Sequence, residues 1–262
     1  MKNNRLSWFR YSLFIIGIGL ISVELGCAVP AQEKEETTRT YPLNAEGKIS
    51  VHNVNGGVEI SVWDRTEVEL QVTKTAKNQA ELDAVKIEIN SDPDRLQIRT
   101  KYPEEKRWKL KKGNSTQVFY KLSVPKHARL DDIADVNGSV DIRGVEGKVK
   151  ASTVNGALKA TGLVAQASLS TVNGSLTADF QRLDDGDVTL DSVNGGIRLS
   201  LPQVANAALS LTTVNGGIHG DLPLDAGRKG KNLKTTLGTG TAKVQASTVN
   251  GGIQVSLTKP SS

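Results

Sequence analysis

The sequence predicts an all-β fold: a single-stranded β-solenoid, or β-helix, with an N-terminal β-rich capping insert that contains a short helix. Three observations favour this class. The tripeptide Val-Asn-Gly occurs seven times, alternating apolar and polar residues flank each copy, and the chain has 25 glycines but only 3 Trp, 4 Tyr and 4 Phe. Glycine suits turns, and small or β-branched side chains suit layered strands. A meander of tandem β-hairpins is the alternative.

The asparagines mark the period of the repeat. They are Asn55, Asn137, Asn155, Asn173, Asn194, Asn215 and Asn250. From Asn137 the steps are 18, 18, 21, 21 and 35 residues, and the shorter steps suit one solenoid coil per copy. Equivalent positions of stacked coils lie about 4.8 Å apart. We therefore expect these structural turn asparagines to form a ladder of hydrogen-bonded side-chain amides.

The residues on both sides of each turn alternate with a period of two. The third residue after each asparagine is apolar: Val58, Val140, Leu158, Leu176, Ile197, Ile218 and Ile253. The residue after it is polar in every copy. The fourth residue before each asparagine is also apolar: Val51, Ile133, Ala151, Leu169, Leu190, Leu211 and Ala246. A half-buried strand therefore enters each turn and another leaves it.

The valine of the tripeptide decides between the two arrangements. A hairpin turn at Asn-Gly, where both residues tolerate positive φ, would direct the valine outward. A valine in all seven copies indicates instead that it faces the core. The alternation must then slip at the small polar pair that precedes it, such as Ser152-Thr153, as at a corner or bulge. Corners that connect stacked strands predict the solenoid.

The chain divides into five predicted segments. Residues 1–27 are a signal peptide, 28–40 a flexible solvated tether, and 259–262 a tail. Residues 41–128 form an N-terminal coil and the capping insert, with strands near 67–73, 85–89, 96–100 and 118–124 and a helix near 76–84. Residues 129–258 form the Val-Asn-Gly solenoid.

The first segment carries the features of an export signal. Basic residues precede an apolar stretch at 13–23, which is shorter than the roughly 20 residues that a membrane-spanning helix needs. Cys27, the only cysteine, resembles the lipidated cysteine of bacterial lipoproteins. Cleavage after Ala31 by ordinary signal peptidase is the alternative. We therefore expect an exported protein, either membrane-anchored through lipid at Cys27 or free in the periplasm or outside the cell.

Four stretches of the sequence carry a resemblance to a known family. They are ISVHNVNGGVEI at residues 49–60, a helix-bearing insert, YKLSVP at 120–125, and the repeated STVNG. Over roughly residues 41–257 the chain is similar to the bacterial DUF4097 family, whose members are described as adhesins with a β-helical repeat. The resemblance implies an envelope location and a non-enzymatic role. It supplies no catalytic or ligand residues.

Catalytic and metal-binding patterns are weak in this sequence. An acidic loop suits a calcium ion in principle, although a solvated turn is the simpler interpretation: Asp184, Asp185, Asp187 and Asp191. Asp131, Asp132 and Asp135 receive the same interpretation, and the three histidines have no metal-ligand spacing. We expect no catalytic residues, no metal and no cofactor. The alternatives to an adhesin-like scaffold are a polysaccharide-processing β-helix enzyme and an envelope-stress sensory or binding module.

The strongest candidate for binding lies outside the repeat, at residues 101–112. An exposed hairpin loop is its simpler interpretation, and a patch for anionic polymers or lipid headgroups is the sharper one. The proposed patch residues are Lys106, Arg107, Trp108, Lys109 and Lys111. We expect any binding to run through this segment rather than the asparagine ladder, to an envelope polymer or protein partner. A net charge of +5 without a recognition motif predicts no nucleic-acid partner.

Overall fold

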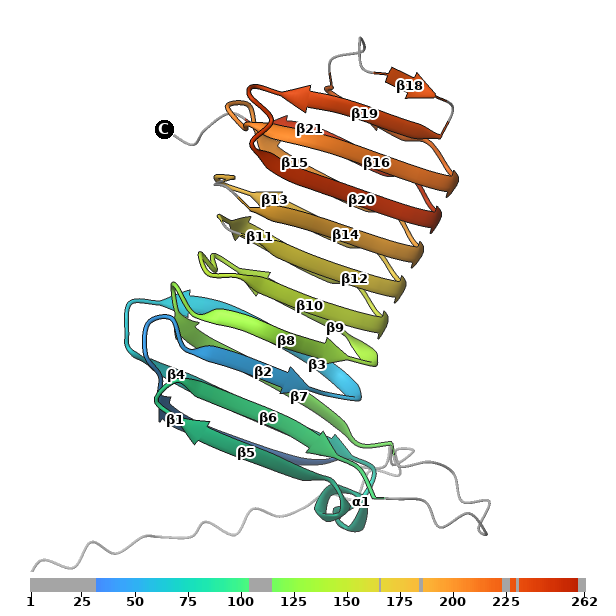
Figure 1. Cartoon of the computed structure of the whole chain (residues 1–262). Helices are drawn as coiled ribbons and strands as arrows, with labels where there is room; N and C mark the ends of the chain where they lie inside the picture. The colour runs from blue at the N-terminus through green and yellow to red at the C-terminus, as the bar shows by residue number, and fades with distance from the viewer. Residues whose placement is uncertain are drawn as a thin grey trace, which may run out of the picture. The chain divides into compact units, whose positions relative to one another are not determined.

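The described part of the chain forms two β-sheets that face each other, and within each sheet the strands lie one above the next along the stack (Figure 1). The computed structural model describes residues 32–103, 115–164, 166–183, 186–222, 227–229 and 231–258. The predicted all-β class is confirmed. In this part, the helix is α1 (Gln79–Ala84), which begins at the N-cap Asn78. No helix among the described residues has the length and hydropathy to cross a membrane.

The spatial order of the strands in both sheets differs from their order in the chain. The 10-stranded sheet contains, from one edge to the other, β1 (Glu33–Pro42), β4 (Glu67–Ala76), β7 (Gln117–Pro125), β3 (Asn55–Trp63), β9 (Asn137–Arg143), β11 (Leu158–Leu163), β13 (Leu176–Phe180), β15 (Ile197–Pro202), β21 (Ile253–Thr258) and β17 (Ile218–Gly220). The 11-stranded sheet contains β18 (Gly227–Lys229), β19 (Asn232–Leu237), β16 (Ala207–Asn215), β20 (Ala242–Asn250), β14 (Asp187–Asn194), β12 (Ala167–Asn173), β10 (Val149–Asn155), β8 (Arg129–Asp135), β2 (Lys48–His52), β6 (Arg95–Lys101) and β5 (Lys86–Asp92).

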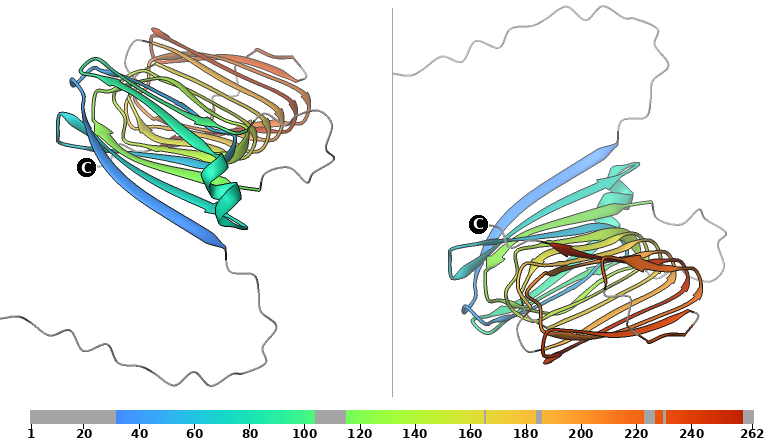
Figure 2. Two further views of the ribbon diagram at one scale, coloured as in Figure 1. Left: turned by 90° about the horizontal axis from the view of Figure 1, so that it is seen from below. Right: turned by 90° about the horizontal axis from the view of Figure 1, so that it is seen from above.

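Each Val-Asn-Gly corner joins one strand of the 11-stranded sheet to one strand of the 10-stranded sheet to form a coil. In β10–β11 the corner follows Asn155, and the next coil repeats it at Asn173. These coils pair in parallel, with Asn155 opposite Asn173 and Leu158 opposite Leu176. Because hairpins would give antiparallel neighbours, the meander alternative is wrong. Figure 2 shows the coils almost end-on, as flattened loops.

The coils do not stack in chain order at either end. The last coil, β20–β21, lies between β14–β15 and β16–β17. Near the N-terminus, β2–β3 likewise lies between β8–β9 and β6–β7. The long interval after Asn55 contains the outer coil β6–β7 together with β4 and β5, and the long interval before Asn250 contains β18 and β19.

The expected tether at residues 28–40 is wrong where it overlaps the described chain. Residues 33–42 form β1, which pairs antiparallel with β4 from Glu33 opposite Ala76 to Pro42 opposite Glu67. Its sequence lacks an apolar period because the strand lies at the sheet edge. Backbone hydrogen bonds to β4 hold it there, rather than burial of its side chains in the core. Charged side chains on such an edge discourage pairing with other chains.

The inward direction of the repeated valine is also wrong. The valine side chains lie on the surface, and the residue before each valine is buried instead, as Thr153 and Thr171 show. The alternation therefore slips at asparagine. Buried hydroxyls bond across coils: Thr153 Oγ1 donates to the Gly138 carbonyl at 2.8 Å, and Thr171 Oγ1 to that of Gly156 at 3.1 Å. The residue at this position must be small to fit inside the corner, and it must be polar to donate to the carbonyl of the neighbouring coil.

The glycine of the tripeptide is required by close packing between coils. A Cβ on Gly174 would lie 2.0 Å from the Gly156 carbonyl oxygen, and one on Gly195 would lie 1.8 Å from that of Gly174. Among the described glycines of the tripeptide, only Gly56 has positive φ. Positive φ therefore does not explain the glycine in the other copies, whereas steric exclusion of Cβ does.

One position of the buried hydroxyl column holds a carboxyl group. Asp135 is 2% exposed; its Oδ2 accepts a 2.8 Å hydrogen bond from Asn53 Nδ2, and its Oδ1 has no partner in the described structure. Asn53 Oδ1 in turn accepts from Thr100 Oγ1 at 2.9 Å. Burial raises the pKa of Asp135, and the Asn53 bond opposes this shift. The expected solvated position of Asp135 is wrong.

The glycine packing predicts a difference between adjacent positions of one corner. Gly195→Ala should destabilise the protein by about 1–3 kcal/mol, because its Cβ would overlap a backbone oxygen. Gly196→Ala is the matched control, since its Cβ would lie 3.3 Å from the Gly252 carbonyl oxygen. Thermal denaturation should show a loss of about 2–4 °C per kcal/mol for Gly195→Ala only. Equal melting temperatures for the two variants would contradict the packing argument.

The buried carboxyl predicts greater stability at acid pH. Unfolded Asp135 has an ordinary pKa of about 3.9, and its folded pKa is higher. Its favourable contribution is complete below the unfolded pKa and is lost as the pH rises through the folded pKa. Asp135→Asn should therefore raise the melting temperature at pH 7, with the advantage shrinking on acidification. Exposed Asp187→Asn is the control, and a less stable Asp135→Asn protein at pH 7 would refute the prediction.

Candidate functional site

The asparagine side chains form a continuous ladder on the outside of the corner. Except at Asn55, which only accepts, each Nδ2 donates to the asparagine Oδ1 of a neighbouring coil at 2.8–2.9 Å. In spatial order the ladder contains Asn55, Asn137, Asn155, Asn173, Asn194, Asn250 and Asn215. This order reproduces the exchanged coils and shows that the last coil joins the same column. An amide has two N–H donors, and the ladder bond uses one of them.

An apolar column lies directly beside the ladder. We name it the valine stripe, and its members have 38–51% of their surface exposed: Val136, Val154, Val172, Val193, Val249 and Val214. Stacked β-branched side chains suit a strand surface. A contiguous exposed apolar surface is also typical of interaction sites. The valine stripe and the asparagine ladder together give an elongated surface with an apolar and an amide column.

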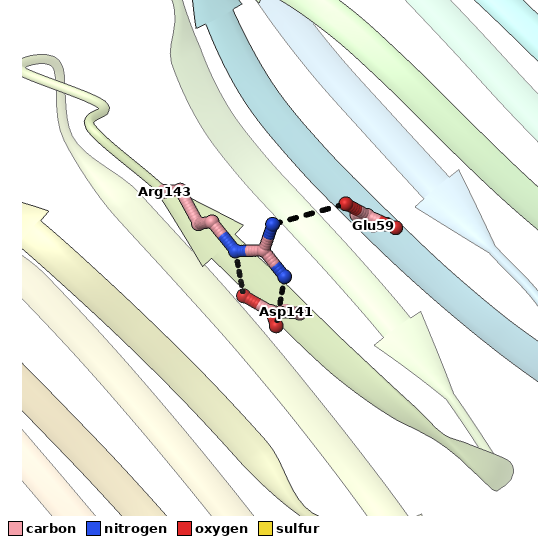
Figure 3. A network of polar contacts seen from close by, with 3 residues as sticks. All are labelled: Glu59, Asp141 and Arg143. Atoms are coloured by element: carbon pink, nitrogen blue, oxygen red, sulfur yellow. Dashed lines mark hydrogen bonds and ion pairs between the residues drawn. The ribbon is translucent and has the colours of Figure 1, made fainter.

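A charged cluster lies on the outer face of the 10-stranded sheet (Figure 3). Arg143 donates to both carboxylate oxygens of Asp141, at 3.1 Å and 2.7 Å, and to Glu59 of the neighbouring coil at 3.2 Å. The hydrogen bonds and charge of Asp141 raise the pKa of Arg143. These side chains are exposed, so the cluster links two coils without sequestering a ligand.

A polar hollow of about 310 Å³ lies on the outer face of the other sheet. His52 Nε2 and Asp132 Oδ2 are 2.8 Å apart there, and Arg99 and Glu88 also line the hollow. His52 and Asp132 come from β2 and β8, which pair in parallel, while Arg99 and Glu88 come from β6 and β5. In the described ranges, no group of His, Cys, Asp and Glu residues has the geometry of a metal site.

A cleft lies at the end of the stack that carries β1 and β5. We name it the end cleft; its volume is about 520 Å³. β1 and β4 form one wall, and β5 forms the other. Val72, Ile87 and Ile89 give it an apolar surface, while Arg39 and Lys86 contribute charge. The cleft could not be foreseen from the sequence, because β1 was expected to be a tether.

Several sequence-predicted residues cannot be placed. Cys27 and the signal peptide lie outside the described residues, as do the patch residues Lys106, Arg107, Trp108, Lys109 and Lys111. The same applies to Asp184 and Asp185 of the acidic loop, and to the tail at 259–262. Asp187 and Asp191 are exposed members of β14, and Ser247 Oγ donates a hydrogen bond to Asp191.

Comparison with solved structures supports the fold. The chain is similar to a "putative cell adhesion protein" from Clostridium sporogenes ATCC 15579, with a TM-score of 0.52, 12% identity, and coverage of 86% of this chain and 100% of that one. It also matches a "putative adhesin" from Bacteroides fragilis NCTC 9343, with a TM-score of 0.33, 12% identity, and coverage of 84% and 97%. A "putative lipid binding protein" from Parabacteroides distasonis ATCC 8503 matches with a TM-score of 0.28 and 12% identity, and the match covers 86% of this chain and 95% of that one.

Sequence comparison identifies the family. No curated protein matches the chain. The sequence model described as Toastrack DUF4097 matches residues 21–256. This match extends over most of the chain, from within the apolar leader to β21, and agrees with the family resemblance of the repeat. The chain therefore belongs to the Toastrack DUF4097 family.

Proposed function

We propose that this protein is an exported, non-enzymatic, adhesin-like interaction protein of the bacterial cell envelope, and that its corner binds an extended glycan polymer. The valine stripe beside the asparagine ladder carries the proposal. The description of the Clostridium sporogenes structure as a cell adhesion protein agrees with it.

The form of the corner favours an extended partner. The same pair of side chains, Val and Asn, recurs in each coil at a spacing of about 4.8 Å. A sugar chain has apolar C–H faces and hydroxyl groups, which match an apolar column and an amide column. Repeated weak contacts along one chain add through effective concentration. A linear surface of this kind needs no deep pocket.

The solenoid itself acts in this proposal as a rigid single-stranded β-helical scaffold. The insert between β3 and β8, together with β1, caps its N-terminal end: β4 and β1 extend one sheet, and β5 extends the other. Antiparallel pairing at these edges ends the parallel stack. Capping of this kind protects the apolar interior and the unpaired backbone groups of a solenoid end.

The valine stripe yields the first functional prediction. Replacing Val154, Val172 and Val193 together by Thr keeps the β-branched shape and removes the apolar surface. Co-sedimentation with purified peptidoglycan should fall to less than half. Stability should change little, because surface substitutions usually alter it by about 0.5 kcal/mol or less each.

Two comparison variants make this experiment selective. Lys159→Thr changes an exposed side chain of the same coil away from the corner and should leave retention unchanged. Replacing Lys106, Arg107, Lys109 and Lys111 by Ser tests the basic segment as the competing site. Full retention by the triple valine variant, with loss in the basic-segment variant at low salt, would transfer the binding function to that segment.

Export and anchoring form a separate part of the proposal. The family match begins within the apolar leader, at residue 21, and we propose that Cys27 is lipidated and tethers the folded part to a membrane. Cys27→Ser should move the protein from the membrane fraction to the soluble extracytoplasmic fraction with an unchanged melting temperature. Intact-mass spectrometry of the wild type should show the added lipid. A mature N-terminus at Gln32 would reject lipidation but retain export.

A further inference from the structure

The end cleft is open because its two walls have different chemistry. On the β5 side, Ile87 and Ile89 point their side chains into it and are only half-buried. On the opposite side, β4 contributes the buried Val72, whereas β1 contributes the polar Thr37 and Arg39. Elsewhere in the stack, apolar residues of both sheets meet and fill the interior. At this end the polar side chains of β1 lie where an apolar strand would complete the packing, and a cleft of about 520 Å³ remains.

Charge is distributed unevenly along the cleft. β1 starts beside α1 (Figure 2, left), where Lys74 Nζ and Glu35 are paired at 2.6 Å. Lys74 is 12% exposed, so this pair closes the polar end of the cleft. Arg39 lies further along β1, opposite Leu70 in the β1–β4 register. Within the described residues, Arg39 has no ion-pair partner.

We propose that the end cleft binds a long-chain fatty acid. Its carboxylate lies at Arg39, and its acyl chain lies along Ile89, Ile87 and Val72 toward α1. The volume falls within the range of about 300–1,000 Å³ that is typical of small-molecule sites. Such sites combine apolar walls with a few polar groups that fix orientation. Arginine supplies several donors in a fixed geometry that suits a carboxylate.

Charge favours this occupant over a neutral one or a cation. The cleft lining contains three cationic residues, Arg39, Lys74 and Lys86, and two carboxylates, Glu35 and Asp83. One of each is neutralised in the Lys74–Glu35 pair. Near Arg39, the cleft-lining residue on β4 is Leu70, which is apolar, and the cleft-lining Ile87 and Ile89 of β5 are apolar as well. An anionic head with an apolar tail fits this order of charge and hydrocarbon.

The test uses the full-length folded protein and dansyl-labelled undecanoic acid as a fluorescent probe. The probe should bind saturably with enhanced, blue-shifted fluorescence, and oleate should displace it whereas oleyl alcohol should displace it far less. Arg39→Gln should weaken probe binding by about tenfold or more at low salt, the loss expected for a hydrogen bond to a charged group. Ile87→Trp, which fills the cleft, should abolish it.

Matched variants separate the cleft from general surface effects. Arg198→Gln removes an exposed cation from the outer face of the 10-stranded sheet, and Val172→Trp enlarges a side chain of the valine stripe. Both should bind the probe as the wild type does. Circular dichroism and melting temperatures for all variants establish that the fold is retained, and Ile89→Phe provides a smaller filling change if Ile87→Trp does not fold.

The outcomes separate the candidate occupants. The proposal would be overturned if the wild type showed no saturable probe binding, or if Arg39→Gln and Ile87→Trp both bound the probe as tightly as the wild type. Binding to phosphatidylglycerol vesicles without binding of the monomeric probe would also overturn it, in favour of a surface contact with lipid headgroups. The result is independent of the peptidoglycan assay, because the cleft and the valine stripe lie on different parts of the stack.

Discussion

The stack depends on the close approach of each corner glycine to a carbonyl oxygen of the neighbouring coil. Because no Cβ fits between them, as at Gly174 and Gly195, the backbones at the corner lie in direct contact. This contact brings successive asparagine amides within hydrogen-bond distance. It also brings the buried hydroxyl of one coil to the glycine carbonyl of the next. One steric requirement thus organises an outer and an inner column of hydrogen bonds.

Much of the repeat architecture could be predicted because it depends on local pattern. The alternation around Leu158 and Leu176 predicts strands with one buried face, and both residues are fully buried. The regular asparagine spacing predicts a ladder, and the amides form it. The helix near residues 76–84 corresponds to α1. In each case, the side chains that give the pattern also make the contacts that determine the structure.

Other features could not be predicted because their causes are nonlocal. The direction of Val154 depends on which neighbour bonds across the coil, and the hydroxyl of Thr153 takes the inner place. β1 has no apolar period, so only its pairing with β4 reveals it as a strand. The end cleft depends on that strand and therefore has no signal of its own in the sequence. The exchange of coils at both ends is likewise a property of pairing.

The exchanged coils have a consequence for how the stack can be completed. β20–β21 is the final coil in the chain, but its neighbours on both sides, β14–β15 and β16–β17, precede it in the sequence. A stack that grew only in chain order would leave an empty layer there. Among the described strands, β16–β17 therefore has no parallel neighbour until β20–β21, which follows it in the sequence, has taken its place in the stack. Loss of β20–β21 would consequently open a gap within the stack rather than shorten it from one end.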